Sequence, residues 1–368
     1  MKIGILTQPL HGNYGGILQN YALQQVLKQM GHNPITIDRH IPRNENIIKR
    51  LGKFILRLSH STYDASLLSL SQKRRLNKNQ LRFISEYIIT TGVILSQKDF
   101  DKAVANKDFQ AFIVGSDQCW RPCYSANINN YFLNFATDSR DVKRIAYAAS
   151  FGVDKWEFSD SQTSLILPLA KSFTAISVRE DSGIALCNNY LEVNSEWVLD
   201  PTMLLGKEGF KRFVGKQNPT NPYICTYILE ESPISHEIVN RIKNLYDINE
   251  IKNNNRSGKF TRFTPLRNYE NISVEEWVTN IANAKALVTD SFHGIAFALL
   301  FNVPFIVRLN NTRGNTRIES LLRDFELEEC ISNAPEMVEI PDIDWDKVNR
   351  HLRERKDESL NFLIRALK

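Results

Sequence analysis

The chain has 368 residues, of which 42% are hydrophobic and 24% are charged. This composition is typical of a globular protein, and the length suits two domains of ordinary size. The formal net charge of +5 is too small for a dedicated nucleic-acid-binding protein, which excludes that class, and it suits a small anionic substrate. Five cysteines at irregular positions argue against a disulfide scaffold, so we expect free thiols and a cytoplasmic protein.

The N-terminal residues predict a strand–helix–strand unit. KIGILT (2–7) is typical of a buried strand, 15–31 has the apolar spacing of an amphipathic helix, and PITIDR (34–39) reads as the next strand. The first residues lack the layout of a signal peptide, and no apolar run is clearly long enough to span a membrane. We therefore expect a soluble protein that begins with its first strand.

Residues 41–108 mix basic and apolar residues, and we expect them to form a helical insertion on the first sheet. Strand-and-loop patterns then recur up to residue 206, which closes a first Rossmann-like domain spanning 1–206. They are AFIVGSDQCW (111–120), RIAYAASFG (144–152), SFTAISVRED (172–181) and EWVLDPTMLL (196–205).

A segment without periodicity, 206–222, separates a second α/β series that we expect to form a domain over 207–368. Its C-terminal helix, from Asp344 onward, carries an apolar stripe with which it could pack back on the first domain. The overall prediction is an α/β protein with two Rossmann-like domains, whose parallel sheets face each other across a cleft. Ligands of such sheets bind at the carboxyl ends of the strands.

Two motifs at predicted strand ends carry glycine and polar residues. HGNYGG (11–16) contains Gly15 and Gly16, which let backbone N–H groups approach an anion at a helix start, although a tight turn explains it equally well. GSDQCW (115–120) contains Asp117 and Gln118, which could hold a sugar hydroxyl or simply cap a turn.

Arginines follow two other predicted strands. Arg179, in SVREDSG (177–183), could clamp a phosphate or carboxylate, and a salt bridge with a neighbouring acid is the alternative. Arg313 and Arg317 lie in a polar loop with Asn315, and three cations that include Arg308 fit a polyanionic ligand or a solvated basic loop.

VTDSFHG (288–294) places His293 at the expected start of a helix. An imidazole there could transfer a proton near neutral pH. Asp290 and Ser291 are expected to end the strand and cap the helix, and Asp290 could also orient the imidazole. The alternative is a histidine that only packs.

Taken in order, NYGGILQNYALQ, GSDQCW, YAASFG, SVREDSG, LDPTMLL and TDSFHG resemble the polysaccharide pyruvyl transferase family over about residues 3–325. The resemblance implies a GT-B-like pair of domains. It also implies transfer of a pyruvyl group from phosphoenolpyruvate to a sugar hydroxyl pair, giving a pyruvate ketal in bacterial surface polysaccharide synthesis. Many relatives have Arg-Leu-His-Gly where this chain has Ser291 and Phe292 before the histidine, so the donor cation must come from elsewhere.

The motifs and the resemblance together assign roles to individual residues, with no cofactor and no metal required. The catalytic candidates are His293, Asp117 and Asp290. The donor-binding candidates are Arg179, Arg313, Asn315, Arg317, Ser291, Gly15 and Gly16. The acceptor-binding candidates are Asn13, Tyr14, Gln118 and Trp120.

Other interpretations stay open. The same architecture serves glycosyltransferases that use a nucleotide sugar, and the fold could also bind or help assemble a glycan without catalysis. The acceptor could be a free sugar or a lipid-linked oligosaccharide. The basic insertion, with KRLGKFILR (49–57) and KRRLNKNQLR (73–82), could rest on the inner membrane surface, or it could form a solvated helix face.

Overall fold

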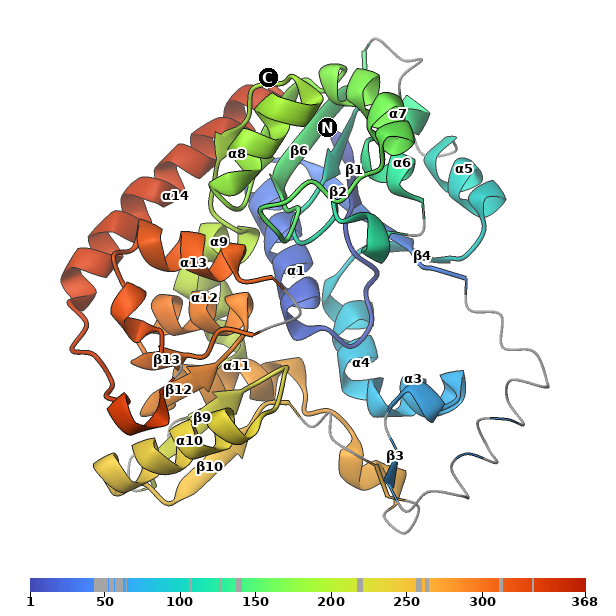
Figure 1. Cartoon of the computed structure of the whole chain (residues 1–368). Helices are drawn as coiled ribbons and strands as arrows, with labels where there is room; N and C mark the ends of the chain where they lie inside the picture. The colour runs from blue at the N-terminus through green and yellow to red at the C-terminus, as the bar shows by residue number, and fades with distance from the viewer. Residues whose placement is uncertain are drawn as a thin grey trace.

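The structure, a computed structural model, consists of two α/β lobes joined along a broad contact (Figure 1). The residues it describes are 1–42, 52, 56, 62–63, 65–105, 108–125, 127–136, 141–216, 221–255, 260–261, 265–310, 314–332 and 334–368.

The first lobe is built on a parallel sheet of seven strands. Its strands run in the order β4 (Thr90–Ile94), β2 (Asn33–Arg39), β1 (Lys2–Leu6), β5 (Ala111–Val114), β6 (Lys143–Ala149), β7 (Ala175–Val178) and β8 (Glu196–Trp197). This is the strand order of a Rossmann domain, with the chain reversing its direction of progress between β1 and β5. Ile5 on β1 lies opposite Thr36 on one side and Ile113 on the other, so β1 is paired along both of its edges.

The second lobe has a smaller parallel sheet. Its strands run in the order β10 (Glu250–Asn253), β9 (Tyr223–Tyr227), β12 (Ala286–Thr289) and β13 (Phe305–Val307). A separate antiparallel pair joins β3 (Thr62–Tyr63) to β11 (Phe260–Thr261), and it links the insertion of the first lobe to the second lobe. Both main sheets therefore point their carboxyl strand ends toward loops that can form a ligand site.

Helices flank both sheets, and among the described residues no helix is both long enough and apolar enough to cross a bilayer. The helices are α1 (Tyr14–Gln29), α3 (Leu70–Leu76), α4 (Lys78–Tyr87), α5 (Gln97–Ala105), α6 (Ile128–Tyr131), α7 (Asp160–Lys171), α8 (Ser182–Leu186), α9 (Pro201–Phe210), α10 (Pro233–Tyr246), α11 (Val274–Ala282), α12 (Phe292–Phe301), α13 (Thr316–Asp324) and α14 (Trp345–Leu367).

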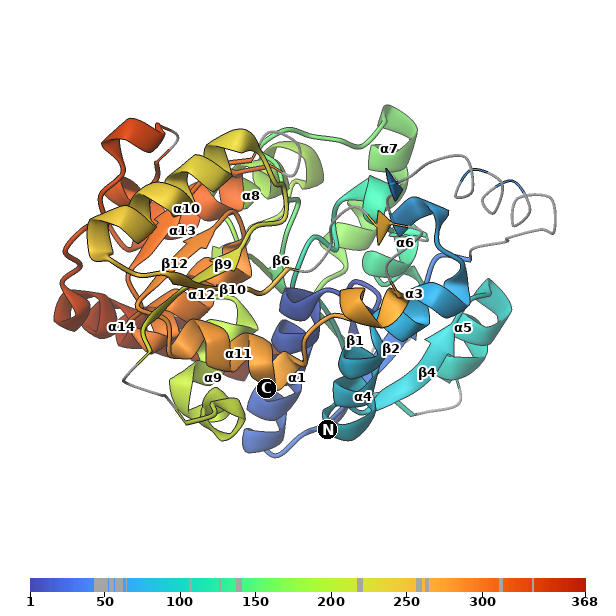
Figure 2. The same cartoon turned by 90° about the horizontal axis from the view of Figure 1, so that it is seen from below.

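The two lobes share one apolar core because α1, α9 and α12 pack together between the sheets (Figures 1 and 2). Phe210 at the end of α9 is central to this layer. Its ring centroid lies 6.0 Å from that of Tyr21 on α1 and 4.8 Å from that of Phe297 on α12. The junction between the lobes is thus a continuous hydrophobic interior at this level.

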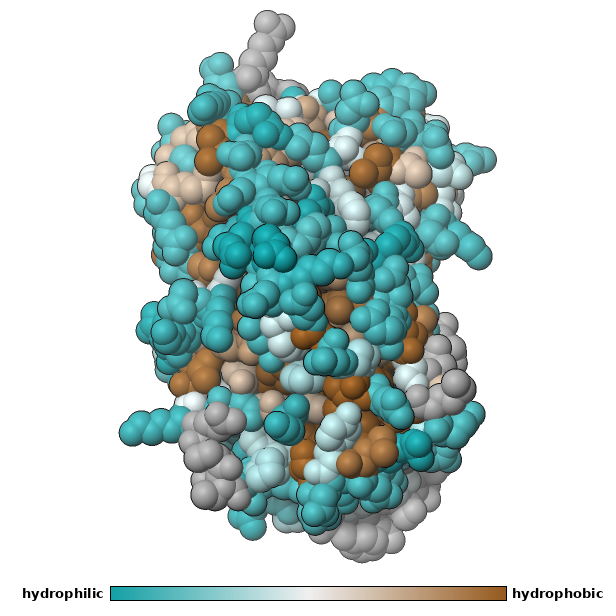
Figure 3. All heavy atoms as spheres, turned by 90° about the vertical axis from the view of Figure 1, so that its left-hand side faces the viewer, coloured by the Kyte–Doolittle hydropathy of each residue, from teal (hydrophilic) through white to brown (hydrophobic). Residues whose placement is uncertain are grey.

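The last helix, α14, runs back from the second lobe onto the first. The Leu199 N–H donates to Ser359 Oγ at 2.9 Å, and the Phe362 ring lies 6.1 Å from that of Tyr147 on β6. The outer side of this face of the molecule is largely hydrophilic (Figure 3). The apolar stripe seen in the sequence is therefore the face with which α14 covers the first lobe.

The insertion differs from the purely helical segment expected over 41–108. Thr90–Ile94 forms β4, the edge strand of the first sheet, because Val93 and Ile94 pair with the end of β2. The basic helices α3 and α4 face the second lobe, where Arg75 and Lys78 bind Glu270. The stretch 49–57, apart from Gly52 and Leu56, lies outside the described residues.

We expect Phe210→Ala to destabilise the whole protein by about 3–5 kcal/mol, because it leaves a cavity in the shared core. Urea unfolding followed by circular dichroism and by tryptophan fluorescence measures this loss, and both signals should change in a single transition. Leu165→Ala, at an exposed position on α7, serves as the control and should cost less than about 0.5 kcal/mol. Two separated transitions would contradict a shared core.

Candidate functional site

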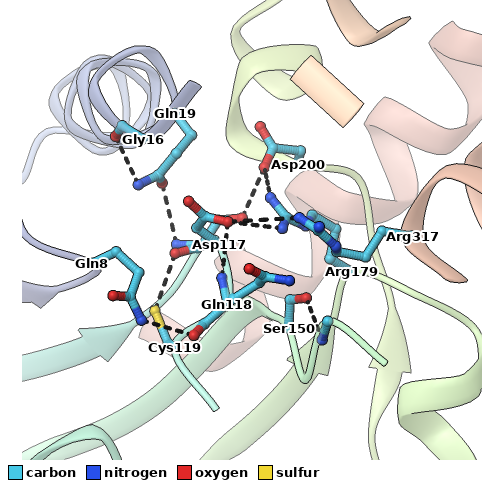
Figure 4. Close-up of polar contacts among 12 residues, drawn as sticks. Gln8, Gly16, Gln19, Asp117, Gln118, Cys119, Ser150, Arg179, Asp200 and Arg317 are labelled. Atoms are coloured by element: carbon cyan, nitrogen blue, oxygen red, sulfur yellow. Dashed lines mark hydrogen bonds and ion pairs between the residues drawn. The ribbon is translucent and has the colours of Figure 1, made fainter. Parts of the chain in front are cut away.

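The predicted motifs meet where the carboxyl ends of the two sheets face each other. The first turn of α1 carries Gly15, the loop after β5 carries Asp117, and β7 ends directly before Arg179. From the second lobe, α12 brings His293 and α13 brings Arg317. Figure 4 shows Asp117 with Arg179 and Arg317 on one side and Asp200 above them.

Arg179 lies at the centre of the cluster and is almost completely buried, with 1% of its side chain exposed. Its Nη1 donates to Asp200 Oδ2 and its Nη2 donates to Asp117 Oδ1, each at 3.1 Å. The Phe292 ring covers the guanidinium at 4.5 Å. One buried cation therefore pairs with two buried carboxylates, and burial of any one of these charges without the others is costly.

Asp200 is the site residue that sequence reasoning missed. It follows β8 and caps α9, where its Oδ1 accepts from both Thr202 N (2.9 Å) and Thr202 Oγ1 (2.7 Å). Its Oδ2 accepts from Ser116 Oγ at 2.8 Å as well as from Arg179. Burial alone raises the pKa of Asp200, but the neighbouring His293, Arg179 and Thr202 outweigh burial and hold the pKa well below its ordinary value. The LDPTMLL motif contained the signal, an Asp-Pro pair at a helix start.

His293 is held between the lobes at the start of α12. A Cβ on Gly15 would lie 2.0 Å from the imidazole Nδ1, so only glycine lets the start of α1 approach this closely. On the other side, Nε2 lies 3.7 Å from Asp200 Oδ2, which is too long for a hydrogen bond but close enough for electrostatic attraction. Within the described part of the chain, Nε2 has no hydrogen-bond partner.

Asp290 and Ser291 do not cap α12 as expected. The Asp290 carboxylate accepts from Leu229 N (2.7 Å) and Glu230 N (2.8 Å), so it binds the loop after β9. Ser291 occupies the N-cap position without a side-chain capping bond, and its own N–H donates to Thr289 Oγ1. The capping prediction is wrong because the neighbouring loop supplies better-placed backbone donors for this carboxylate.

Arg317 is the cation of the cluster whose charge is least neutralised by neighbouring carboxylates. Its Nη1 lies 3.9 Å from Asp117 Oδ1, and among the residues that the structure describes its Nε has no partner. Burial and the nearby Arg179 lower the pKa of Arg317 to about 10, although Asp117 and Glu180 oppose this effect. An anion bound at this guanidinium would offset its burial.

Contacts between the lobes fix α13 and thereby Arg317. Asp181, at the start of α8, accepts from Ser320 Oγ at 2.5 Å and also pairs with Arg323. Gly314 has a φ of 81°, and a Cβ there would lie 2.2 Å from the carbonyl oxygen of Gly152 in the first lobe. Asn315, the N-cap of α13, accepts from Asn310 N at 3.1 Å, while Arg313 lies outside the described residues.

The four predicted acceptor residues are placed very differently. Asn13 is an exposed N-cap of α1, and its side chain accepts from Gly16 N. Gln118 is buried, and no partner for its Nε2 occurs in the described ranges. Tyr14 is buried, donates to Ile272 O and stacks on Trp277 at 5.6 Å.

Trp120 is 0% exposed, and its Nε1 donates to Tyr131 O at 3.0 Å. Its indole also stacks on Phe132, with ring centroids 5.0 Å apart. The side chains of Trp120 and Tyr14 therefore belong to the interior and offer no surface to a sugar. The prediction that they contact an acceptor is wrong for this physical reason.

The arrangement combines an incompletely neutralised cation, Arg317, with an imidazole at a buried junction. Arg179 holds the carboxylates of Asp117 and Asp200 in place near His293. Among the described residues, His293 Nε2 makes no hydrogen bond to any of these groups. Such a site can bind a small anion and transfer a proton. In the described ranges, no group of three His, Cys, Asp or Glu side chains is arranged to hold a metal ion.

The fold belongs to the GT-B-type class, with two Rossmann-like domains. Two similar solved structures are UDP-N-acetylglucosamine 2-epimerases, with TM-scores of 0.50. The enzyme from Neisseria meningitidis, bound to UDP-GlcNAc, is 8% identical over 100% of this chain and 99% of its own. A provisionally assigned enzyme from Listeria monocytogenes is 11% identical over 98% and 90%. At these identities the likeness concerns the fold alone.

The sequence matches one family over most of its length. Residues 13–312 match the family described as polysaccharide pyruvyl transferase, and the chain belongs to this family of transferase enzymes. No protein with a curated functional description matches the chain. The matched range includes Asp117, Arg179, Asp200 and His293, and it ends just before the helix that carries Arg317.

Arg179→Met should destabilise the protein strongly, whereas Arg317→Met should not destabilise it. Loss of Arg179 leaves two buried carboxylates without their cation, so we expect a destabilisation of about 3–5 kcal/mol. Loss of the poorly neutralised Arg317 should leave the free energy of unfolding unchanged or raise it by about 1 kcal/mol. Urea unfolding at neutral pH compares the two variants, and similar losses in both would contradict these assignments.

Asp200→Asn should weaken the dependence of stability on acid pH. The folded protein holds the pKa of Asp200 below its ordinary value, so below about pH 4 the unfolded chain binds a proton that the folded chain does not. The carboxylate therefore stabilises the fold above about pH 4, and this contribution is lost as the pH falls toward the folded-state pKa. Urea titrations at several acid pH values should show a slope smaller by up to about 1.4 kcal/mol per pH unit. A slope equal to that of the wild type would refute this account.

Proposed function

We propose that the protein transfers a pyruvyl group from phosphoenolpyruvate to two hydroxyls of one sugar residue, forming a cyclic ketal. The reaction would serve the synthesis of a bacterial surface polysaccharide, on a free or lipid-linked acceptor in the cytoplasm. The observation that carries this proposal is the incompletely neutralised Arg317 beside Asp117, in a cluster where His293 lies 3.7 Å from Asp200 and in a chain of the pyruvyl transferase family.

Arg317 is the best candidate for direct contact with the donor. Phosphoenolpyruvate carries a phosphate and a carboxylate, and it therefore needs cations or backbone N–H groups. Gly15, at the start of α1, stays a candidate for an N–H contact, and Arg313 stays a candidate for a second cation. The Gly16 and Ser291 N–H groups already donate to Asn13 Oδ1 and Thr289 Oγ1, so either would have to exchange its partner for the donor. Arg179 is already engaged by Asp117 and Asp200, so we assign it a supporting role.

The proposed pyruvyl transfer takes place in two steps. In the first, one sugar hydroxyl loses its proton and its oxygen bonds to the central carbon of the enol, while a proton is added to the methylene carbon, which becomes a methyl group. In the second, another hydroxyl of the same sugar attacks the same carbon, phosphate leaves and the hydroxyl proton is removed. The products are the ketal and inorganic phosphate.

We assign the proton transfer to His293. Its Nε2 is free of hydrogen bonds within the described part of the chain and lies 3.7 Å from Asp200 Oδ2. Asp117 is a second candidate, since Arg317 and the donor would lie beside it. Asp290 accepts from two backbone N–H groups of the loop after β9, and it stays a third candidate.

Two other functions share this fold. A transferase that uses a nucleotide sugar is the main alternative, and a glycan-binding protein without catalysis is the second. Calorimetric titration with phosphoenolpyruvate and with UDP-sugars separates them, because the pyruvyl transferase should bind the first and not the second. A membrane role for the insertion is less favoured, since Arg75, Lys78 and Arg82 already pair with acids.

His293→Gln should lower kcat about 10²–10⁴-fold, as expected for loss of a general acid or base. The assay combines phosphoenolpyruvate with galactosyl, mannosyl or N-acetylhexosamine acceptors and measures phosphate release together with the mass of the pyruvylated sugar. His351→Gln is the matched control, because His351 also faces an aspartate, Asp324 at 3.0 Å, but lies on α14. Full activity of His293→Gln would remove the catalytic assignment.

A further inference from the structure

Three consecutive charged residues, Arg179, Glu180 and Asp181, follow β7 at the junction of the lobes. Arg179 holds the carboxylates of the site, and its two neighbours hold the segments around it. Glu180 is 0% exposed, and its Oε1 accepts from Phe151 N at 2.8 Å and from Gly152 N at 3.1 Å. A single buried carboxylate therefore fixes this turn of the first lobe.

Two contacts hold α13, from the second lobe, against this part of the first lobe. Gly314 precedes α13, and a Cβ there would lie 2.2 Å from the carbonyl oxygen of Gly152. Asp181 accepts from Ser320 Oγ of α13 at 2.5 Å and also pairs with Arg323. Ser320 is 1% exposed, whereas Arg323 is exposed and its ion pair is screened by water. The bond from Ser320 is therefore the stronger constraint on α13.

Arg317 lies midway between these two contacts in the sequence, three residues after Gly314 and three before Ser320. Residues three apart in an α-helix lie on one face, so Arg317 and Ser320 both point toward the first lobe. There Arg317 Nη1 lies 3.9 Å from Asp117 Oδ1 (Figure 4). The placement of Arg317 in the site thus depends on the contacts that α13 makes on either side of it.

We propose that Asp181 is a positioning residue for the donor, because its contacts with Ser320 and Arg323 keep Arg317 where an anion binds. We call these contacts the Asp181 latch. This inference rests on the proposed function, since it concerns the affinity for phosphoenolpyruvate. Without the latch, only a fraction of the molecules has Arg317 in place. The apparent dissociation constant of the donor then rises in inverse proportion to that fraction, while saturating donor restores the competent state and the rate.

Two variants remove the latch from opposite sides. Ser320→Ala deletes the buried bond, and Asp181→Asn deletes the charge but keeps an oxygen that can accept from Ser182 N and cap α8. Each should raise the KM for phosphoenolpyruvate about five- to tenfold and leave kcat and the acceptor KM within about twofold. Steady-state assays of phosphate release measure all three values. A fall in kcat with an unchanged KM for phosphoenolpyruvate would overturn the positioning role.

A double-mutant cycle shows whether the Asp181 latch acts through Arg317. In Arg317→Met the cation is absent, so adding Ser320→Ala should change the KM for phosphoenolpyruvate less than about twofold. An effect as large as in the wild-type background would mean that Ser320 acts by another route, and it would overturn the inference.

The matched control is Glu275→Gln, which makes the same change from carboxylate to amide as Asp181→Asn. Glu275, in the first turn of α11, pairs across the lobes with Arg82 on α4. This pair is about as exposed as the pair of Asp181 with Arg323: the arginine side chains are 45% and 57% exposed, and the carboxylates 25% and 30%. The control should leave the KM for phosphoenolpyruvate unchanged. A rise equal to that in Asp181→Asn would overturn a specific role for the latch.

Hydrogen exchange of the backbone amides of 316–324, followed by mass spectrometry, tests the latch without donor or turnover. Ser320→Ala should speed this exchange, and Glu275→Gln should not. If phosphoenolpyruvate neither binds nor reacts, the proposed function fails, and faster exchange in Ser320→Ala still supports the latch. If phosphoenolpyruvate reacts but Ser320→Ala changes neither the exchange nor the KM, the latch is overturned and the proposed function stands.

Discussion

The buried guanidinium of Arg179 is the interaction on which the site depends. It neutralises Asp117 and Asp200, which come from the end of β5 and the start of α9. Because none of these three charges is stable in the interior without the others, the strand ends and α9 are fixed relative to one another. Asp200 extends this constraint to the second lobe, since His293 Nε2 faces it at 3.7 Å.

The apolar layer of α1, α9 and α12 carries the polar cluster at one end. Two of these helices, α1 and α12, begin beside the site, where Gly15 lies against His293. Farther along they enter the shared core, where Tyr21 of α1 and Phe297 of α12 pack against Phe210 of α9. Rigid helices thus position the imidazole, which favours a proton transfer that requires defined geometry. The cluster is least buried at Arg317, with 12% of that side chain exposed, so the proposed anionic donor would approach from the side of α13.

The sequence predicted the parallel sheets and the gathering of the motifs, because buried strands of this class read as apolar runs and their carboxyl ends share one edge. It did not reveal Asp200 as a partner of Arg179, since a carboxylate before a proline reads locally as a helix cap. Trp120 and Tyr14 were misassigned because an aromatic residue in a site motif can equally well belong to the core. The edge strand β4 and the pairing of the insertion with Glu270 depend on contacts far apart in the sequence, which no local pattern encodes.

The departure of this chain from the Arg-Leu-His-Gly pattern has a spatial counterpart. Phe292, directly before His293, lies against the guanidinium of Arg179 at 4.5 Å, so this position serves packing over a cation from the first lobe. Arg179 pairs with Asp117, and a second cation, Arg317 on α13, lies 3.9 Å from the same Asp117 carboxylate. The junction therefore keeps two guanidinium groups near His293, although neither comes from the segment that precedes the histidine. The charge required for an anionic donor is thus a property of the assembled site, and the absence of arginine from one motif does not remove it.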